Sequence, residues 1–224
     1  MNKSSPMEQL AHDRTAAVSH GLAHLPLADG PKVVTQIQAH ETAALGRRKP
    51  LSEEDIHPLL SFMPSHIEQL QVQSRGDTWL ASSAPDRGGR HSQYIHVAAD
   101  RSIELVSVLA AGGWGNEART WWPGAYELPL LKALSANAIP ILKQLGTGLP
   151  ARVFISLTDI AGTAIVTESD LGIECPFPLP AGIDSLHFAP VDLGETESCR
   201  EALSTSFNTI REIVGLKNTM PFYF

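Results

Sequence analysis

The chain has 224 residues, of which 17 are basic and 24 acidic, so its formal net charge is −7 with histidine neutral. A chain of this length can bury about 70% of its unfolded surface, and it needs no metal or disulfide to hold a core. With 43% hydrophobic and 18% charged residues, the composition is that of a globular protein and excludes disorder, collagen and a coiled coil. No segment approaches the roughly 20 apolar residues of a membrane span, so no membrane partner is expected.

The first helix is predicted over residues 6–23. Ser5 can cap it, Pro6 suits its first position, and Glu8 completes a capping box. Charged and histidine residues interrupt this stretch, which excludes a secretory signal. The two cysteines, Cys175 and Cys199, are expected to be reduced, as in most cytosolic proteins. A cytoplasmic location is the expectation.

Two further helices are predicted in the first 64 residues. One covers residues 33–45 and ends at Gly46, and another covers residues 52–63 and ends at Pro64. Residues 1–64 are therefore predicted to be a helical segment that packs on the rest of the chain or on a partner.

From residue 65 onward the hydrophobic pattern is mostly that of strands. Hairpins are predicted from three pairs of segments: 67–73 with 78–83, 91–97 with 102–109, and 152–158 with 163–167. Long helices are predicted over residues 128–145 and 195–214. Residues 111–124 are predicted to be a loop, 175–181 coil, and 185–189 an edge strand. The prediction for residues 65–224 is an α+β domain, with a mainly antiparallel sheet of hairpins packed against two long helices.

Three of the four tryptophans, Trp114, Trp121 and Trp122, lie in the predicted loop at 111–124. Tryptophans outside regular structure often anchor an interface or line an apolar pocket. The alternative is that they fold back to cover the sheet. These three residues are the candidate binding site, and a protein is the expected partner.

Catalytic and cofactor motifs are not evident in the sequence. Residues 113–118 fit G-x-G-x-x-A, but Trp121-Trp122-Pro123-Gly124 interrupts the helix that a dinucleotide site requires. His20 and His24 share a helix face without a carboxylate at matching spacing, and His91 and His96 lie on opposite faces of a strand. No G-x-S-x-G motif occurs. The expectation is no metal, no cofactor and no catalysis, while an enzyme whose groups meet only in three dimensions stays open.

Basic residues are sparse in the last third, where residues 150–224 carry four basic and ten acidic side chains. This balance disfavours nucleic acid, because phosphate binding depends on clustered Lys and Arg. The basic run Arg47-Arg48-Lys49 follows a predicted helix end, where cations meet the negative end of the helix dipole. If nucleic acid binds, the candidate contacts are Arg47, Arg48, Lys49, Arg87, Arg90 and Arg101.

Residues from about 90 to 224 contain a characteristic order of segments. They are Arg101-Ser102-Ile103-Glu104, Glu127-Leu128-Pro129-Leu130-Leu131, Arg152 to Leu157 followed by Asp159-Ile160-Ala161-Gly162, and a last helix ending Val214-Gly215-Leu216. This order resembles the region that follows the AlbA-like domain in bacterial Schlafen-type AlbA-like DNA-binding proteins. The resemblance implies a nucleic-acid-associated regulator. The helical first 64 residues stand where the AlbA-like domain would be, so no site residue carries over.

The sequence as a whole favours an accessory or interaction protein that acts as a subunit of a larger bacterial assembly. A nucleic-acid-associated regulator is the alternative, and an enzyme with a site not visible in the sequence is the second alternative.

Overall fold

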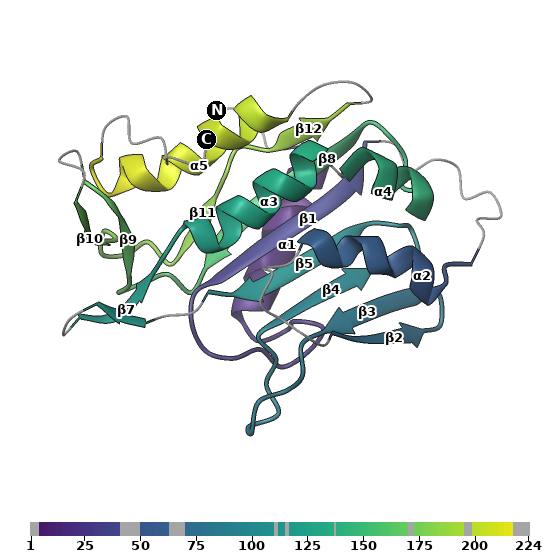
Figure 1. Ribbon diagram of the computed structural model, residues 1–224, viewed down its shortest axis with the longest axis horizontal. Helices are drawn as coiled ribbons and strands as arrows, with labels where there is room; N and C mark the ends of the chain where they lie inside the picture. Colours follow the sequence, from purple (N-terminus) through teal and green to yellow (C-terminus); the bar gives the residue numbers. More distant parts are fainter. Residues whose placement is uncertain are drawn as a thin grey trace.

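The computed structural model describes residues 5–40, 50–62, 70–109, 112–114, 117–136, 138–169, 173–194 and 199–216. Side chains are described over the same ranges except at residues 112–114, 117, 118 and 136. Within these residues the chain forms two sheets and several short helices (Figure 1). The predicted α+β class with a mainly antiparallel sheet is confirmed.

The large sheet contains eight strands among the described residues, in the order β11-β8-β1-β5-β4-β3-β2, with β12 also paired to β8. The strands are β1 (Lys32–Ala39), β2 (Gln71–Arg75), β3 (Thr78–Ser82), β4 (Gln93–Val97), β5 (Ile103–Val108), β8 (Ala151–Thr158), β11 (Ser185–His187) and β12 (Val191–Leu193). The hairpins β2–β3 and β4–β5 confirm two of the three predicted pairings.

A second, smaller sheet lies at one end of the molecule and has the order β10-β9-β7-β6 (Figure 1). Its strands are β6 (Gly112–Trp114), β7 (Glu117–Trp121), β9 (Ala164–Glu168) and β10 (Glu174–Pro178). Strands β7 and β9 run parallel, and the other pairs are antiparallel.

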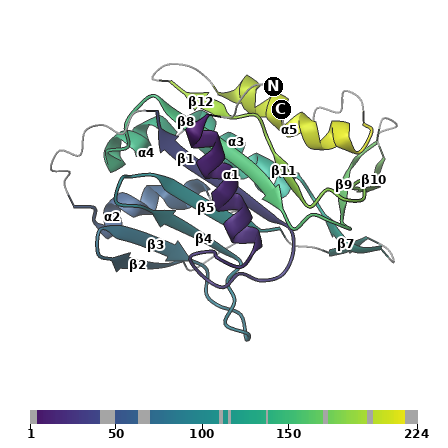
Figure 2. The same cartoon turned by 180° about the vertical axis from the view of Figure 1, so that it is seen from behind.

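The helices are α1 (Pro6–Ser19), α2 (Glu53–Ile56), the 3-10 helix η1 (His57–Phe62), α3 (Gly124–Ala136), α4 (Ala138–Leu145) and α5 (Arg200–Ile213). Helices α2, α3 and α4 lie on one face of the large sheet (Figure 1), and α1 crosses the opposite face (Figure 2). Helix α1 has the predicted capping box between Ser5 and Glu8.

The two faces of the large sheet differ in chemistry because alternate residues of each strand point to opposite sides. On β1, Val33 and Ile37 belong to the main hydrophobic core beneath α3 and α4. Val34, between them, packs instead with Val18 of α1 in a small separate cluster. Polar residues such as Gln36 accompany Val34 on the α1 side. The apolar face therefore supplies most of the core, and the α1 face is mixed.

Several predicted elements are wrong. Residues 33–45 were expected to be helical, but Lys32–Ala39 is the central strand β1, paired with both β5 and β8. The described part of the first 64 residues is therefore not purely helical. The long helix expected over 128–145 is two short helices, α3 and α4, and α5 has 14 residues, so two long helices are absent from the described chain.

The strand pairs were also misassigned in the last third. Residues 152–158 and 163–167 form β8 and β9, but these consecutive strands belong to different sheets and do not pair. Asp159 turns the chain between them with a φ of 58°.

Other segments expected to be irregular contain strands. The expected loop at 111–124 contains β6 and β7, and the expected coil at 175–181 contains most of β10. The expected edge strand at 185–189 is confirmed as β11.

Candidate functional site

The α1 face of the sheet brings together five ionisable side chains that we call the Glu104 cluster: Arg14, His24, Tyr94, His96 and Glu104. In the register of the β4–β5 hairpin, His96 lies opposite Glu104. Tyr94 is two residues from His96 on β4 and therefore shares its face. Arg14 comes from α1, and His24 comes from the segment that follows α1.

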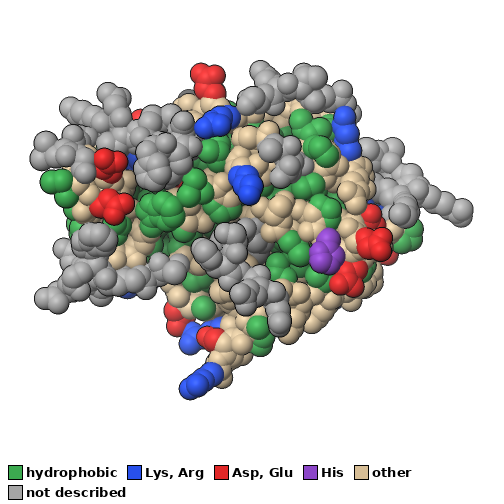
Figure 3. All heavy atoms as spheres, viewed as in Figure 1, with side chains coloured by type: hydrophobic (Ala, Val, Ile, Leu, Met, Phe, Trp, Pro, Cys, Tyr) green, Lys and Arg blue, Asp and Glu red, His purple; other side chains and the backbone are tan. Residues whose placement is uncertain are grey.

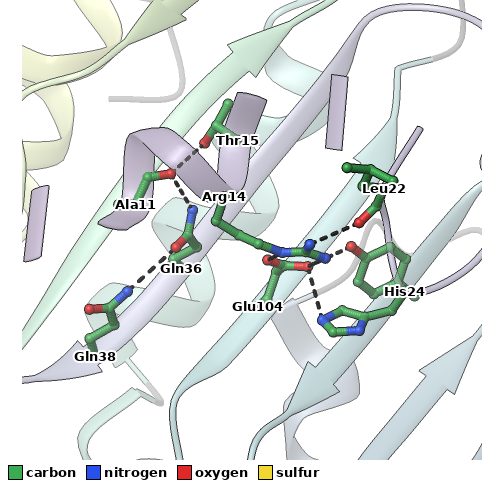
Figure 4. Close-up of polar contacts among 9 residues, drawn as sticks. Ala11, Arg14, Thr15, Leu22, His24, Gln36, Gln38 and Glu104 are labelled. Carbon is green, nitrogen blue, oxygen red and sulfur yellow. Dashed lines mark hydrogen bonds and ion pairs between the residues drawn. The ribbon is translucent and has the colours of Figure 1, made fainter. Parts of the chain in front are cut away.

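Glu104 is the centre of the cluster (Figure 4). Arg14 donates from Nε to Oε2 at 2.6 Å and from Nη2 to Oε1 at 3.0 Å, and the Tyr94 hydroxyl donates to Oε1 at 2.5 Å. The Glu104 side chain is only 9% exposed. A two-point contact of this kind between guanidinium and carboxylate is strong and directional. It fixes α1 to β5 across 90 positions of sequence.

The loop after α1 is tied into the same cluster. Arg14 donates from Nη1 to the Leu22 carbonyl at 2.8 Å. The His24 ring stacks on His96 with centroids 3.8 Å apart and planes tilted by 27°, and its Nε2 is 3.6 Å from Glu104 Oε1. The ring edge of His24 also meets Tyr94. One arginine and one histidine thus hold both the helix and the loop on the sheet.

Burial keeps the cluster's side chains in defined protonation states. Burial lowers the pKa of His24 from its ordinary value, against the opposing effect of Glu104, and lowers the pKa of His96 to about 4. Both imidazoles are therefore neutral at pH 7. Burial, with the Glu104 carboxylate beside it, raises the pKa of Tyr94, so its hydroxyl remains a donor.

The hydrogen bonds of this cluster attach α1 and its following loop to the sheet. Both carboxylate oxygens of Glu104 already accept hydrogen bonds. Because burial lowers the pKa of His96 to about 4, its imidazole is a poor proton acceptor at neutral pH. No Ser, Thr or Cys hydroxyl or thiol is among the five residues. Over the described ranges, no group of three or more His, Cys, Asp or Glu side chains is arranged to hold a metal ion.

Helix α1 makes two further polar contacts with the sheet side, one through His12, before Arg14, and one through Ser19, after it. The His12 ring packs against His187 of β11 with centroids 4.0 Å apart and planes tilted by 31°, and His187 Nδ1 lies 2.8 Å from the Ser156 hydroxyl. Burial, followed by the effect of His12, lowers the pKa of His187. Near the end of α1, the Ser19 hydroxyl donates to Asp159 at 2.8 Å, and Asp159 also pairs with Lys32.

The candidate tryptophans occupy two different environments. Trp121 is 2% exposed and donates from Nε1 to the Thr163 hydroxyl at 2.9 Å, so it packs in the core. This matches the alternative in which a tryptophan folds back. Trp122 is 42% exposed. Trp114 lies in β6, and its side chain is outside the described residues.

Gly124 explains how Trp122 is held. A Cβ atom at position 124 would lie 2.2 Å from the Trp122 ring, which is far inside van der Waals contact. The indole therefore lies directly against the backbone at the start of α3. The ring thus has backbone on one side, while the residue as a whole is 42% exposed.

The three candidate nucleic-acid contacts among the described residues, Arg87, Arg90 and Arg101, have different environments. Arg101 is 6% exposed, and Arg90 pairs with Asp29 at 2.5 Å, while Arg87 is exposed. Arg47, Arg48 and Lys49 lie outside the described residues. Figure 3 shows the coloured Lys and Arg side chains of one face scattered across it. Arg101, being buried, does not offer its guanidinium to a phosphate.

A small cavity lies between the apolar face of the sheet and α3. Thr35, Ser107 and Tyr126 contribute to its lining together with apolar side chains. It has room for about one water molecule. A cavity of this size takes no organic substrate without rearrangement.

The sequence reasoning missed the Glu104 cluster, although one signal was present. That signal, the predicted hairpin, is off by one residue, since a turn at residues 98–101 places His96 opposite Ile103. In the structure Ala98 bonds to Ser102 and Arg101 takes a φ of 71°, which moves the register and puts His96 opposite Glu104. The contributions of Arg14 and His24 come from a helix placed by tertiary packing, and no local pattern reports that placement.

Comparison with known proteins found no matching protein family, no matching curated protein and no matching solved structure. The resemblance of residues 90–224 to AlbA-like DNA-binding proteins stays a prediction. None of the described helices has the length and apolar character needed to cross a bilayer.

Proposed function

We propose that this chain is a non-catalytic interaction protein, an accessory subunit that binds another protein through a surface centred on Trp122. The observation that carries the proposal is the seating of the half-exposed indole against Gly124. Tryptophan is enriched among residues that dominate binding energy. A ring already fixed before binding loses little conformational freedom on association.

The neighbouring sheet indicates what chemistry the partner presents. Glu168 of β9 and Glu174 of β10 are directly opposite each other in the strand register, and both are exposed. Like charges in opposed positions destabilise a strand pair. Ile173, next to Glu174, is 61% exposed. A partner with an apolar pocket and a basic rim would cover the exposed apolar side chains and neutralise the glutamates.

Photocrosslinking tests this proposal in cells that naturally produce the chain. A photoreactive phenylalanine analogue at Ile173 is expected to give one heteromeric product. Trp122→Ala in the same chain is expected to lower its yield at least tenfold, since anchor residues typically contribute about 2 kcal/mol or more. Leu22→Ala is the matched control, because Leu22 is also an exposed apolar residue, at 67%, but follows α1.

The outcomes separate the alternatives. A crosslinker at Gln73, on the distant strand β2, is expected to give none of this product. A product that Trp122→Ala leaves unchanged would contradict the proposal, as would a monomer with no heteromeric product. A product that contains only nucleic acid would favour the regulator.

A further inference from the structure

Helix α1 is attached to the sheet mainly through polar contacts. Ala11, Thr15 and Val18 are its buried residues, and two of these are small. The Gln36 amide donates to the Ala11 carbonyl at 3.0 Å, and Arg14 and Ser19 reach Glu104 and Asp159. The apolar contact of this segment with the sheet is one small cluster, in which Val18, Ala23, Leu25 and Leu27 pack with Val34, Leu80, Tyr94 and Val106. Its hydrophobic stabilisation is therefore smaller than that of the main core.

Two histidine ring pairs, one stacked and one tilted, join this segment to the sheet. His12 of α1 lies on His187 with centroids 4.0 Å apart, and His24 lies on His96 with centroids 3.8 Å apart. In each pair, one ring comes from the α1 segment and the other from a strand. Protonation of both rings of a pair would place two like charges at this distance, which opposes contact.

The charged groups that face His24 and His96 come from four elements. Arg14 of α1 and Arg75 of β2 are cations, and Tyr94 of β4 is neutral. Glu104 of β5 is the one carboxylate that influences both rings, and Arg14 already neutralises it. A proton added to either ring therefore gives this buried cluster a net positive charge.

The His12 and His187 pair has fewer charged neighbours. His187 contacts the neutral Ser156 hydroxyl. Besides burial, the charge of His12 lowers the pKa of His187. Glu8 is one turn before His12 on α1, but its carboxylate is bonded to the Ser5 backbone at the helix cap. No described contact supplies a carboxylate to this pair.

We propose that residues 6–27 form an acid-released strap: protonation of the two histidine pairs detaches α1 and its following loop from the sheet. Detachment uncovers the mixed sheet face around Gln36, Tyr94 and Ser156, including the apolar side chains of Val34, Leu80 and Val106. The second sheet and Trp122 take no part in it, so the strap is independent of the proposed partner surface.

The direction of the pH effect follows from proton linkage. The pKa of His96 falls from an ordinary value of 6.5 to about 4 in the docked state. The detached state therefore binds protons more readily, and docking loses stability as the pH falls from 6.5 towards 4. Well above pH 6.5, His96 is neutral in both states, and its protonation no longer opposes docking.

Hydrogen exchange measured by mass spectrometry tests the strap. Between pH 7 and pH 5, after correction for the intrinsic exchange rate, protection of residues 6–22 is expected to fall roughly tenfold or more. Protection of β1, β5 and β8 is expected to change much less. The double variant His24→Gln/His96→Gln is expected to lose most of the pH dependence, and His20→Gln, an exposed histidine at the helix end, is expected to keep it.

The opposite outcomes overturn the proposal. One is that the exchange protection of residues 6–22 does not change with pH. Another is that this protection falls no more than the protection of the core strands. The third is that the His24→Gln/His96→Gln variant responds to acid as the parent does. If that variant fails to fold, His12→Gln/His187→Gln replaces it and is expected to remove the smaller share of the pH dependence that this pair contributes. A response to acid equal to that of the parent would again overturn the proposal. The photocrosslinking yield at Ile173 at pH 7 does not depend on these substitutions.

Discussion

The buried ion pair between α3 and α5 gives the most direct test of what holds the helical layer together. Arg211 donates from Nη1 and Nη2 to the two oxygens of Glu127 at 2.7 and 2.8 Å. The exposed fractions of the two side chains are 3% and 0%. Arg211 also donates to the Phe207 carbonyl at 3.1 Å. Replacing Arg211 by Met leaves the Glu127 carboxylate buried without its cation.

The expected cost follows from this burial. Removing one partner of a buried, hydrogen-bonded pair destabilises by about 3–5 kcal/mol, because the remaining charge is desolvated and uncompensated. In a chain of this size, that corresponds to a fall in melting temperature of roughly 6–20 °C. Replacing both groups, as in Glu127→Leu/Arg211→Met, removes both buried charges. The double variant is expected to recover most of the loss.

Urea unfolding at pH 7 and 25 °C measures these free energies. Lys132→Met is the matched control, since Lys132 is an exposed cation on α3 and its loss is expected to cost within about 0.5 kcal/mol. The reasoning is refuted if Arg211→Met costs no more than Lys132→Met. It is also refuted if the double variant is as unstable as the sum of its two single variants.

Other substitutions test the tryptophans and the Glu104 cluster. Trp121→Ala is expected to destabilise the fold by about 3–5 kcal/mol in urea, whereas Trp122→Ala should stay within about 0.5 kcal/mol; equal losses would contradict their assigned environments. Gly124→Ala is expected to displace the Trp122 ring and shift its fluorescence emission, and an unchanged spectrum would count against the seating. Glu104→Gln is expected to speed hydrogen exchange in α1 roughly tenfold at pH 7, because the ionic contact with Arg14 is lost; an unchanged rate would show that the contact does not hold the helix.

The sequence was most informative where contacts are local. The hairpins β2–β3 and β4–β5 follow from alternating strands joined by short turns, and the α1 capping box depends on residues three positions apart. The helix predicted over 33–45 was wrong because the apolar residues Val33, Val34 and Ile37 fit helical spacing as well as a strand. Pairing on both sides, with β5 and β8, decides between them.

Long-range pairing explains the other errors. Strands β8 and β9 have the composition and turn of a hairpin, but β8 pairs with β1, β11 and β12 instead. The Glu104 cluster also depends on contacts between residues far apart in the sequence, because Arg14 reaches Glu104 only once α1 lies across the sheet. Of the predicted binding residues, Trp122 is exposed and Trp121 is buried, a difference that neighbouring positions in one sequence segment do not reveal.

The central position of β1 has a consequence for synthesis on the ribosome. Lys32–Ala39 leaves the exit tunnel early, yet one of its two neighbours, Ala151–Thr158, is translated far later. Until then, the nascent sheet presents an open backbone edge, which is prone to pairing with other chains. Non-local pairing of this kind also slows folding. Chaperone capture of truncated nascent chains should therefore persist until residue 158 has emerged and decline once β8 has joined.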